Sequence, residues 1–255
     1  MIRIARAPEP ASLAPVRSQG LTEARDAVLQ KKKIVFEGYD VVKKDLAAMQ
    51  HQKCCYCEKR EEQAKYRDVE HYRPKSLYWW LAWTWENLLF ACIDCNREQK
   101  RDRFPLEPGC TTLVAEQAPP AAERPLLLDP SDLSVEPTKE IVFFRERIQV
   151  KERWIPRGVS ARGRATVEVC GLDRPNLLDL YAEHVLHAVR PKLERFFAAH
   201  QASDGRAAFE AWETARRGLL ARARPFRALS YDALNVFVPA GLRASYPLML
   251  DCPAP

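Results

Sequence analysis

The sequence contains no long apolar run. Its most apolar window, residues 79–93, is interrupted by Glu86 and Asn87, and it is shorter than the ~20 apolar residues that a membrane-spanning helix needs. The first ten residues, MIRIARAPEP, contain early arginines but no apolar stretch behind them, so the sequence predicts no secretory signal. These two absences argue against a membrane-embedded or an exported protein, and we expect a cytoplasmic protein without a membrane partner.

The composition is that of a globular protein with a mild basic excess. Hydrophobic residues make up 47% of the 255 positions, which is enough to fill a core. Lysine and arginine number 40 against 34 acidic residues, for a formal net charge of +6. This excess suits a polyanionic partner, although many soluble proteins carry as much. The chain has eight cysteines, and in a reducing cytoplasm their clustering favours metal binding over disulfides.

The sequence pattern predicts an α+β protein in four parts. Residues 1–50 form a strand and helical lead, in which residues 2–4 alternate like a strand and a helix resumes after Gly20. Residues 51–108 hold the motifs and form the functional module. Residues 109–125 are rich in proline and alanine and form a linker or loop. Residues 126–255 form a mostly α-helical C-terminal region.

The C-terminal region also contains strand-like segments. Branched and aromatic residues predict strands at 126–129 and 141–150. Helical spacing predicts helices at 164–169, 176–189, 192–201 and 205–223.

Four of the cysteines form two CxxC pairs. Cys54 and Cys57 make the first pair and Cys92 and Cys95 the second, with 34 residues between them. Two thiolate pairs of this kind hold tetrahedral Zn²⁺ at Zn–S distances of ~2.3 Å, with no position open for substrate. Incidental buried cysteines are the alternative, but cysteine is sparse elsewhere in the chain. We therefore predict one structural Zn²⁺, without Cys55, which would break the spacing of the first pair.

Residues between and beside these pairs have the chemistry of a hydrolase. His71, with an unperturbed pKa of ~6.5, suits a general base at neutral pH. Glu70 and Asn96 offer hard oxygen ligands for a catalytic Mg²⁺ or Mn²⁺. Asn87 is neutral, and it can fix the hairpin or orient His71 by hydrogen bonding. Phosphodiester hydrolysis needs a deprotonated water and positive charge on the phosphate, and these residue types supply both.

These motifs resemble those of a known nuclease family. The strings CCYCEKR, DVEHYRPK and WENLLFACIDCNREQK, followed by FP, resemble the zinc-knuckle branch of the HNH (ββα-metal) endonucleases. More closely, they resemble the PtuB-like HNH nucleases of Septu-type anti-phage defence systems. The resemblance implies a ββα-metal core, endonuclease activity, a role in defence and a partner ATPase of the PtuA type. Many HNH enzymes have Asp before the histidine where this chain has Glu70, so Asp68 is a rival metal ligand.

Basic residues flank the catalytic motifs. Lys75 and Lys100 follow the motifs directly and are the preferred phosphate contacts, and Arg73 and Arg97 are further candidates. Acidic residues in the same module leave a solvated face of mixed charge as the alternative. A second basic stretch, residues 145–164, has only two acids, and it fits either a nucleic-acid backbone track or a solvated surface.

The sequence therefore predicts an endonuclease that hydrolyses nucleic acid, with DNA as the expected substrate. It would hold a structural Zn²⁺ and one catalytic Mg²⁺ or Mn²⁺. Cleavage of RNA, including tRNA, is one alternative. The other is a non-catalytic zinc module that binds nucleic acid or protein, which accounts for the cysteines but gives no reason for Glu70, His71 and Asn96 together.

Overall fold

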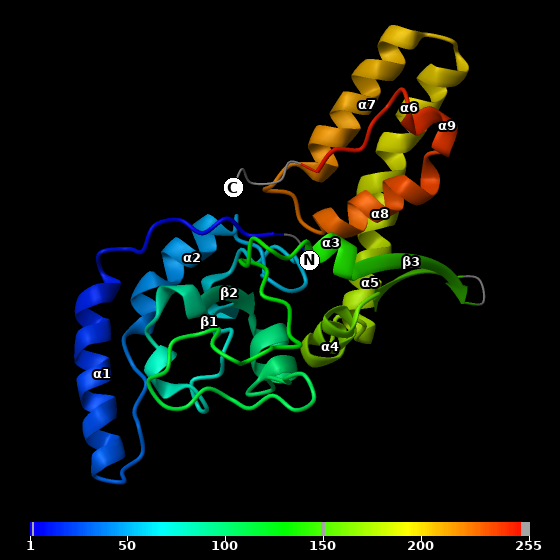
Figure 1. Ribbon diagram of the computed structural model, residues 1–255. Coiled ribbons are helices and arrows are strands. Elements are labelled where there is room, and N and C mark those ends of the chain that lie inside the picture. Colours follow the sequence, from blue (N-terminus) through cyan, green and yellow to red (C-terminus); the bar gives the residue numbers. More distant parts are fainter. Residues whose placement is uncertain (2, 149–150, 251–255) are drawn as a thin grey trace.

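The computed structural model describes residues 1, 3–148 and 151–250. Figure 1 shows two lobes. The amino-terminal lobe holds helices α1 and α2 and a hairpin of β1 and β2, and the C-terminal lobe holds the β3–β4 hairpin and a group of helices from which α6 and α7 extend outward. The fold is thus mixed α and β with two small antiparallel sheets. Among the described residues, no helix is both long enough and apolar enough to cross a membrane.

The elements follow one another along the chain with these bounds. The amino-terminal lobe contains α1 (Leu13–Leu29), η1 (Tyr39–Val42), α2 (Lys43–Met49), η2 (Ala64–Tyr66), β1 (Arg67–His71), η3 (Trp79–Leu81), η4 (Trp85–Asn87), β2 (Leu88–Cys92) and η5 (Asp94–Lys100). After it come α3 (Pro137–Glu140), β3 (Ile141–Ile148), β4 (Lys151–Gly158), α4 (Ala161–Cys170), α5 (Pro175–His184), η6 (Val185–Val189), α6 (Arg190–Gln201), α7 (Gly205–Leu220), α8 (Arg227–Phe237) and α9 (Ala240–Arg243).

Helix α1 begins earlier than the sequence pattern predicts. It starts at Leu13, so Pro15 lies in its first turn, where a missing backbone N–H costs nothing. Gly20 lies inside the helix, at a position where a Cβ would come within 2.5 Å of the Trp83 ring, so the packing requires glycine there. The predicted strand at residues 2–4 is also wrong for the described residues 3 and 4, which lie outside any strand, while residue 2 is outside the described part. The backbone N–H of Ile4 instead donates to the Pro130 carbonyl at 2.7 Å.

The β1–β2 hairpin leads directly into η5. The strands are antiparallel, with His71 opposite Leu88 and Asp68 opposite Ala91. All five residues of β2 are buried, which fits its apolar sequence LLFAC. Because successive side chains of a strand alternate between its faces, Asp68 and Glu70 share one face of β1. The described chain therefore has two strands followed by a helical segment, and the assignment of this unit to an HNH core remains a prediction.

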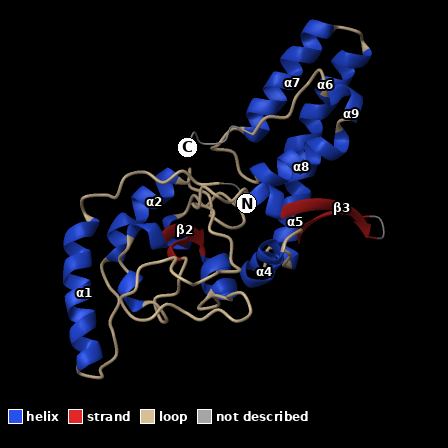
Figure 2. Cartoon of the chain, in the orientation of Figure 1, coloured by secondary structure: helices blue, strands red, loops and turns tan. Residues whose placement is uncertain are grey.

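The C-terminal region is mainly helical, as the sequence predicts. The expected helices correspond to α4, α5 with η6, α6 and α7, and the strand expected at 141–150 corresponds to β3. Helix α8 was not predicted, and Arg227 at its first position is buried. The strand expected at 126–129 is wrong: these residues form no strand. Figure 2 shows the predominance of helices in the C-terminal lobe. Residues 109–125 form neither a helix nor a strand, and the division of the chain into four parts remains a prediction.

One hydrophobic core runs through both lobes. It joins the cysteine module, with Tyr56 and Leu89, to the helical lobe, with Trp154 and Trp212. A smaller cluster beneath α1 and α2 buries Trp85 together with residues of β2. The cysteine module therefore lies where the two lobes share their packing.

Asp232 of α8 links that helix to β3 and gives a test of stability against pH. Its Oδ2 accepts the backbone N–H of Phe143 at 2.8 Å, and burial raises the pKa of its carboxyl to about 6. The folded state thus holds the proton more tightly than the unfolded chain, and ionisation costs stability as pH rises from about 4 to 6. We expect Asp232→Asn, which keeps an acceptor oxygen, to raise the free energy of unfolding by up to about 3 kcal/mol above pH 6.

The gain from Asp232→Asn should shrink as pH falls below 6 and vanish near pH 4. Urea unfolding at several pH values measures it, with the exposed Asp26→Asn as the matched control. A gain that is equal at pH 4.5 and pH 8 would show that ionisation of Asp232 does not limit stability.

Candidate metal centre and catalytic pocket

Four cysteines converge at the start of the module. The Sγ atoms of Cys54, Cys57, Cys92 and Cys95 all lie within 4.8 Å of one another, and all four residues are buried. Tetrahedral Zn²⁺ with Zn–S bonds of ~2.3 Å requires S···S separations of about 3.8 Å, and the Sγ atoms of Cys57 and Cys92 are 3.9 Å apart. The four residues therefore fit a metal such as zinc. Cys55 is buried but is not part of this cluster.

Basic side chains compensate the charge that four thiolates would carry. Arg174, between α4 and α5, approaches Cys95 Sγ with its guanidinium at 3.6 Å and pairs with Asp94 at 3.6 Å. Lys59, just after the first cysteine pair, also pairs with Asp94, at 3.3 Å. Because Arg174 belongs to the C-terminal lobe, the centre connects the two lobes by charge as well as by packing.

A polar pocket of about 890 Å³ lies beside this centre. Its walls come from β1, from the start of η5, and from residues 36–40 and 43 of the amino-terminal lobe. It contains His71, Glu70 and Asn96 of the predicted catalytic set. The structure therefore brings these three residues around one cavity, whereas Asn87 is not part of the lining.

His71 is held in one orientation. Its Nε2 lies 2.9 Å from the Ala82 carbonyl, and because a carbonyl only accepts, Nε2 carries the hydrogen and Nδ1 keeps a free lone pair in the neutral ring. The Tyr39 ring packs edge-on against the imidazole, with centroids 4.7 Å apart. Burial, with a smaller effect of Lys75, lowers the pKa of His71 to about 3. The ring is therefore neutral, with Nδ1 as its basic atom, and its pKa lies well below the value of ~6.5 on which the sequence-based expectation rested.

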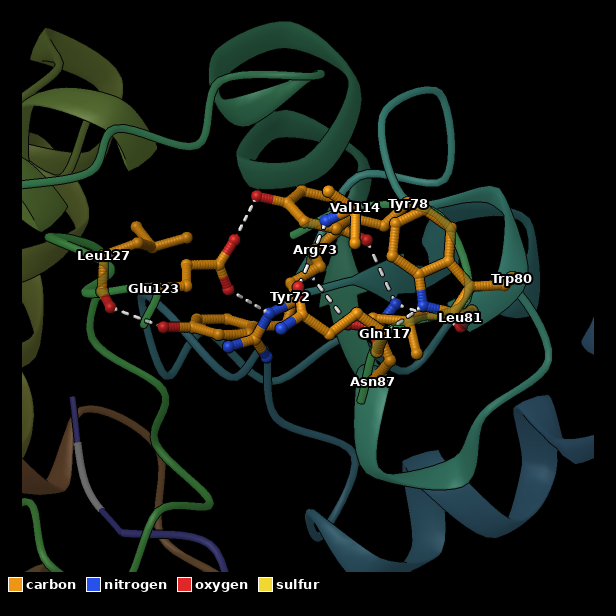
Figure 3. A network of polar contacts seen from close by, with 10 residues as sticks. All are labelled: Tyr72, Arg73, Tyr78, Trp80, Leu81, Asn87, Val114, Gln117, Glu123 and Leu127. Atoms are coloured by element: carbon orange, nitrogen blue, oxygen red, sulfur yellow. Dashed lines mark hydrogen bonds and ion pairs between the residues drawn. The ribbon is translucent and has the colours of Figure 1, made fainter. Parts of the chain in front are cut away.

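Asn87 fixes the loop that anchors His71 (Figure 3). Its Oδ1 accepts the backbone N–H of Arg73 at 2.8 Å, and its Nδ2 donates to the carbonyls of Arg73 and Leu81 at 3.0 and 3.1 Å. The Leu81 carbonyl precedes that of Ala82, which accepts from His71. These contacts of Asn87 thus lie within the hairpin and its loop, and its role in catalysis remains a prediction.

Glu70 is buried in an ion pair. Only 1% of its surface is exposed, and its Oε1 accepts from Tyr56 at 3.0 Å and contacts Lys100 Nζ at 2.7 Å. Burial raises the pKa of Glu70 above its ordinary value against the opposing effect of Lys100. Lys100 is itself fully buried and also donates to the His71 carbonyl at 2.9 Å. Lys100 therefore contacts both Glu70 and the backbone of β1, and it is not part of the pocket lining.

Asn96 contacts Asp68, the rival ligand. Its Nδ2 lies 3.2 Å from Asp68 Oδ2. Arg97 holds the same carboxylate with two hydrogen bonds of 2.7 and 2.6 Å, while 67% of the Arg97 side chain remains exposed. The structure thus places Asn96 next to Asp68, with Glu70 two residues further along the same strand face.

The two other predicted phosphate contacts differ in position. Lys75 lines the pocket and lies over the Tyr39 ring at 4.3 Å. Arg73 is outside the pocket lining, and its Nε donates to buried Glu123 at 2.7 Å. Lys75 and Arg97 therefore line the pocket, where Arg97 also pairs with Asp68, whereas Arg73 lies outside the lining and pairs with Glu123.

The loop at residues 109–125 packs onto the module (Figure 3). Glu123 is 4% exposed and accepts hydrogen bonds from Arg73 and from the Tyr78 hydroxyl. Trp80 Nε1 donates to the Gln117 carbonyl at 2.9 Å. These contacts hold the loop against the surface of the module formed by residues 51–108.

Tyr39 and its neighbours were not predicted as site residues. Gly38, which directly precedes Tyr39, has a positive φ of 80°. This turn brings Tyr39 against His71 and places Lys43 in the pocket wall. A glycine flanked by aromatic and charged residues was the available signal in the sequence. It could not identify the contact, because His71, on which Tyr39 packs, lies more than 30 positions further along the chain.

A four-cysteine centre beside a polar pocket with a fixed histidine defines a protein equipped to bind metal. No protein-family model matches the chain. The chain is similar to the Septu protein PtuB of Bacillus mycoides (strain KBAB4), with 31% identity over 202 residues, which cover 70% of this chain and 65% of that protein. It is also similar to the Septu protein PtuB of Bacillus thuringiensis, with 45% identity over 60 residues, or 23% of each chain.

A further similarity is to the Septu protein PtuA of Bacillus mycoides (strain KBAB4). Identity is 26% over 144 residues, which cover 51% of this chain and 19% of PtuA. The chain therefore spans just under two thirds of the first PtuB and a fifth of PtuA. These similarities support a PtuB-like protein.

Proposed function

We propose that the protein is an HNH-type endonuclease that hydrolyses phosphodiester bonds of nucleic acid, with DNA as substrate. The observation that carries the proposal is His71, whose Nε2 is bound to the Ala82 carbonyl while the ring lines a pocket that also contains Asp68, Glu70 and Asn96. A neutral imidazole with one nitrogen anchored and the other free is the arrangement of a general base.

In this proposal each residue has one task. His71 Nδ1 takes the proton of the attacking water, and the Ala82 carbonyl holds the ring in the tautomer that leaves Nδ1 free. Tyr39 limits rotation of the ring by edge-on packing. Lys75 and Arg97, at the pocket wall, contact the phosphate of the substrate. Water activation by the base and positive charge near the phosphate are then both in place.

The oxygen donors around the pocket suit a hard divalent cation. Asp68, Glu70 and Asn96 offer carboxylate and amide oxygens, the donor types that Mg²⁺ and Mn²⁺ prefer. We propose Glu70 and Asn96 as the ligands, since Glu70 is adjacent to the base and is fixed by Tyr56 and Lys100. A bound Mg²⁺ or Mn²⁺ would supply positive charge to the phosphate and acidity to a bound water.

The similarity to PtuB and PtuA suggests the biological setting. Both relatives are named as Septu proteins. We propose that this chain acts in Septu-type anti-phage defence together with a partner ATPase of the PtuA type. Co-purification of the chain with the product of a PtuA-like gene from the same genome tests this part independently of catalysis.

Incubation with nucleic acids tests the proposed activity. Purified protein with Mg²⁺ or Mn²⁺ is expected to cleave duplex DNA, and single-stranded DNA and tRNA are run in parallel. Cleavage of tRNA alone would change the substrate class to RNA. Binding without cleavage of any substrate, with zinc bound, would indicate a non-catalytic zinc module.

Metal titration separates Glu70 from Asp68 as the ligand. Loss of a group that only hydrogen-bonds to a metal ligand typically weakens metal binding by ~10- to 100-fold. We expect Glu70→Gln and Asn96→Ala to raise the metal concentration for half-maximal cleavage by more than this. Asp68→Asn should stay within that range. Excess Mn²⁺ should partly restore Asn96→Ala by mass action. Glu98→Gln, an exposed acid on the same helical segment, is the control. The reverse ranking would assign the ion to Asp68 and Asn96, the pair in contact.

A further inference from the structure

One face of the β3–β4 hairpin changes from apolar to basic along the length of the hairpin. In its register Phe143 lies opposite Pro156, Arg145 opposite Trp154, and Arg147 opposite Glu152. Since alternate residues share a face, the face that buries Phe143 and Trp154 near the lobe carries Arg145 and Arg147 further out. Figure 1 shows β3 extending outward beyond α5 and α8. The arginines thus occupy the part of the ribbon that leaves the core.

Arg190, at the start of α6, completes a cleft with these residues. The cleft has a volume of about 480 Å³ and is lined by Arg145, Arg147, Glu152 and Arg190, for a formal charge of +2. Glu152 Oε2 pairs with Arg145 at 2.8 Å and with Arg190 at 2.7 Å. One carboxylate therefore holds two guanidiniums in place without neutralising the cleft.

An aromatic ring fixes the same two guanidiniums. The Arg145 and Arg190 guanidinium carbons lie 5.1 and 4.8 Å from the centroid of the Phe237 ring. Their side chains are 45% and 37% exposed, so N–H donors still face solvent. Within the described part of the chain, Arg147 makes no ion pair. The result is a preorganised group of planar donors, which matches the geometry of a phosphate.

We propose that this arginine cleft, formed by Arg145, Arg147, Glu152 and Arg190, is a second, non-catalytic contact site for the nucleic-acid backbone. The inference rests on the proposed nuclease function and adds a binding site away from the pocket of His71. All four lining residues are charged, whereas protein-binding surfaces combine an apolar centre with a polar rim. A polyanionic backbone therefore fits the cleft better than a protein partner does.

Salt dependence of binding tests the proposal directly. Fluorescence anisotropy with a labelled 30-base-pair DNA duplex gives log Kd against log salt concentration for the wild-type protein, for Arg147→Gln and for Arg145→Gln/Arg147→Gln. Each phosphate contact that is lost should lower the slope by about 0.9. We expect a decrease of about 0.9 for the single variant and about 1.8 for the double variant. Arg206→Gln is the matched control, because Arg206 is 90% exposed on α7 and pairs with Glu210 of the same helix.

The outcomes separate this site from the proposed activity. An unchanged slope in both cleft variants would overturn the proposal, as would a loss of slope equal to that of Arg206→Gln. A cleft variant that keeps its DNA slope but no longer binds a PtuA-type protein would assign the cleft to a protein partner instead. Hydrolysis of bis(4-nitrophenyl) phosphate by the wild-type protein, a substrate too small to span both sites, tests the nuclease proposal separately. A cleft-dependent slope without any hydrolysis would retain the cleft and remove the nuclease.

Discussion

Replacement of His71 by alanine should reduce metal-dependent cleavage of nucleic acid by roughly 10²- to 10⁴-fold, the contribution of a positioned general base. His71 Nε2 is held by the Ala82 carbonyl, and within the described residues no hydrogen bond to Nδ1 is found. The loss should appear in kcat, because the base acts in the chemical step and contributes little to binding of the substrate. Single-turnover cleavage at saturating Mg²⁺ measures it.

A second variant separates chemistry from folding. His71→Gln can still donate to the Ala82 carbonyl, but its amide cannot accept a proton, so it should be as inactive as His71→Ala while packing against Tyr39 is better preserved. His187→Ala removes an exposed histidine from η6 and serves as the control. Zinc content and DNA affinity should be close to wild type in all three variants. Cleavage by His71→Gln at the wild-type rate would remove His71 from the mechanism.

The sequence identified the parts of the site whose chemistry is local. Two CxxC pairs specify a four-sulfur centre because the spacing within each pair already places two ligands together, and the fold only has to join the pairs. The side chains of His71 and Asn96 also reach one pocket because β1 and η5 flank that centre. The clustering of the four cysteines could be predicted because short spacing and chemical type carry that information, whereas the catalytic roles of His71 and Asn96 remain predictions.

Contacts that depend on tertiary packing were not predictable in the same way. Burial decides that Lys100 faces Glu70 and that Arg73 faces Glu123, and no spacing in the sequence distinguishes a buried lysine from one that meets a phosphate. The packing of Tyr39 against His71 likewise joins residues from two separate segments. The start of α1 was missed for a simpler reason: proline is compatible with the first turn of a helix, and Gly20 can lie within the helix where Trp83 requires close approach.

Substitutions in the four-cysteine centre should lower the stability of the molecule more than substitutions in any other structural element. We expect Cys57→Ser or Cys95→Ser to abolish tight zinc binding and to destabilise both lobes. Closed four-thiolate sites bind Zn²⁺ with an apparent free energy of ~10–16 kcal/mol that is also folding energy, which exceeds or matches the whole stability of a typical domain. Since the four cysteines share one core with Trp154 and Trp212, and Arg174 contacts Cys95 from the C-terminal lobe, the loss should spread beyond the module.

Two measurements on the same samples check this expectation. Elemental analysis should find one zinc per chain in the wild-type protein and none in Cys57→Ser, and near-ultraviolet circular dichroism of the tryptophans should show early thermal unfolding of the variant. Cys110→Ser, which replaces a partly exposed cysteine outside the cluster, is the matched control and should keep both zinc and stability. If Cys57→Ser loses its zinc yet unfolds at the wild-type temperature, the centre does not stabilise the fold. In that case the shared core, with its large aromatic side chains, must hold the two lobes together without the metal.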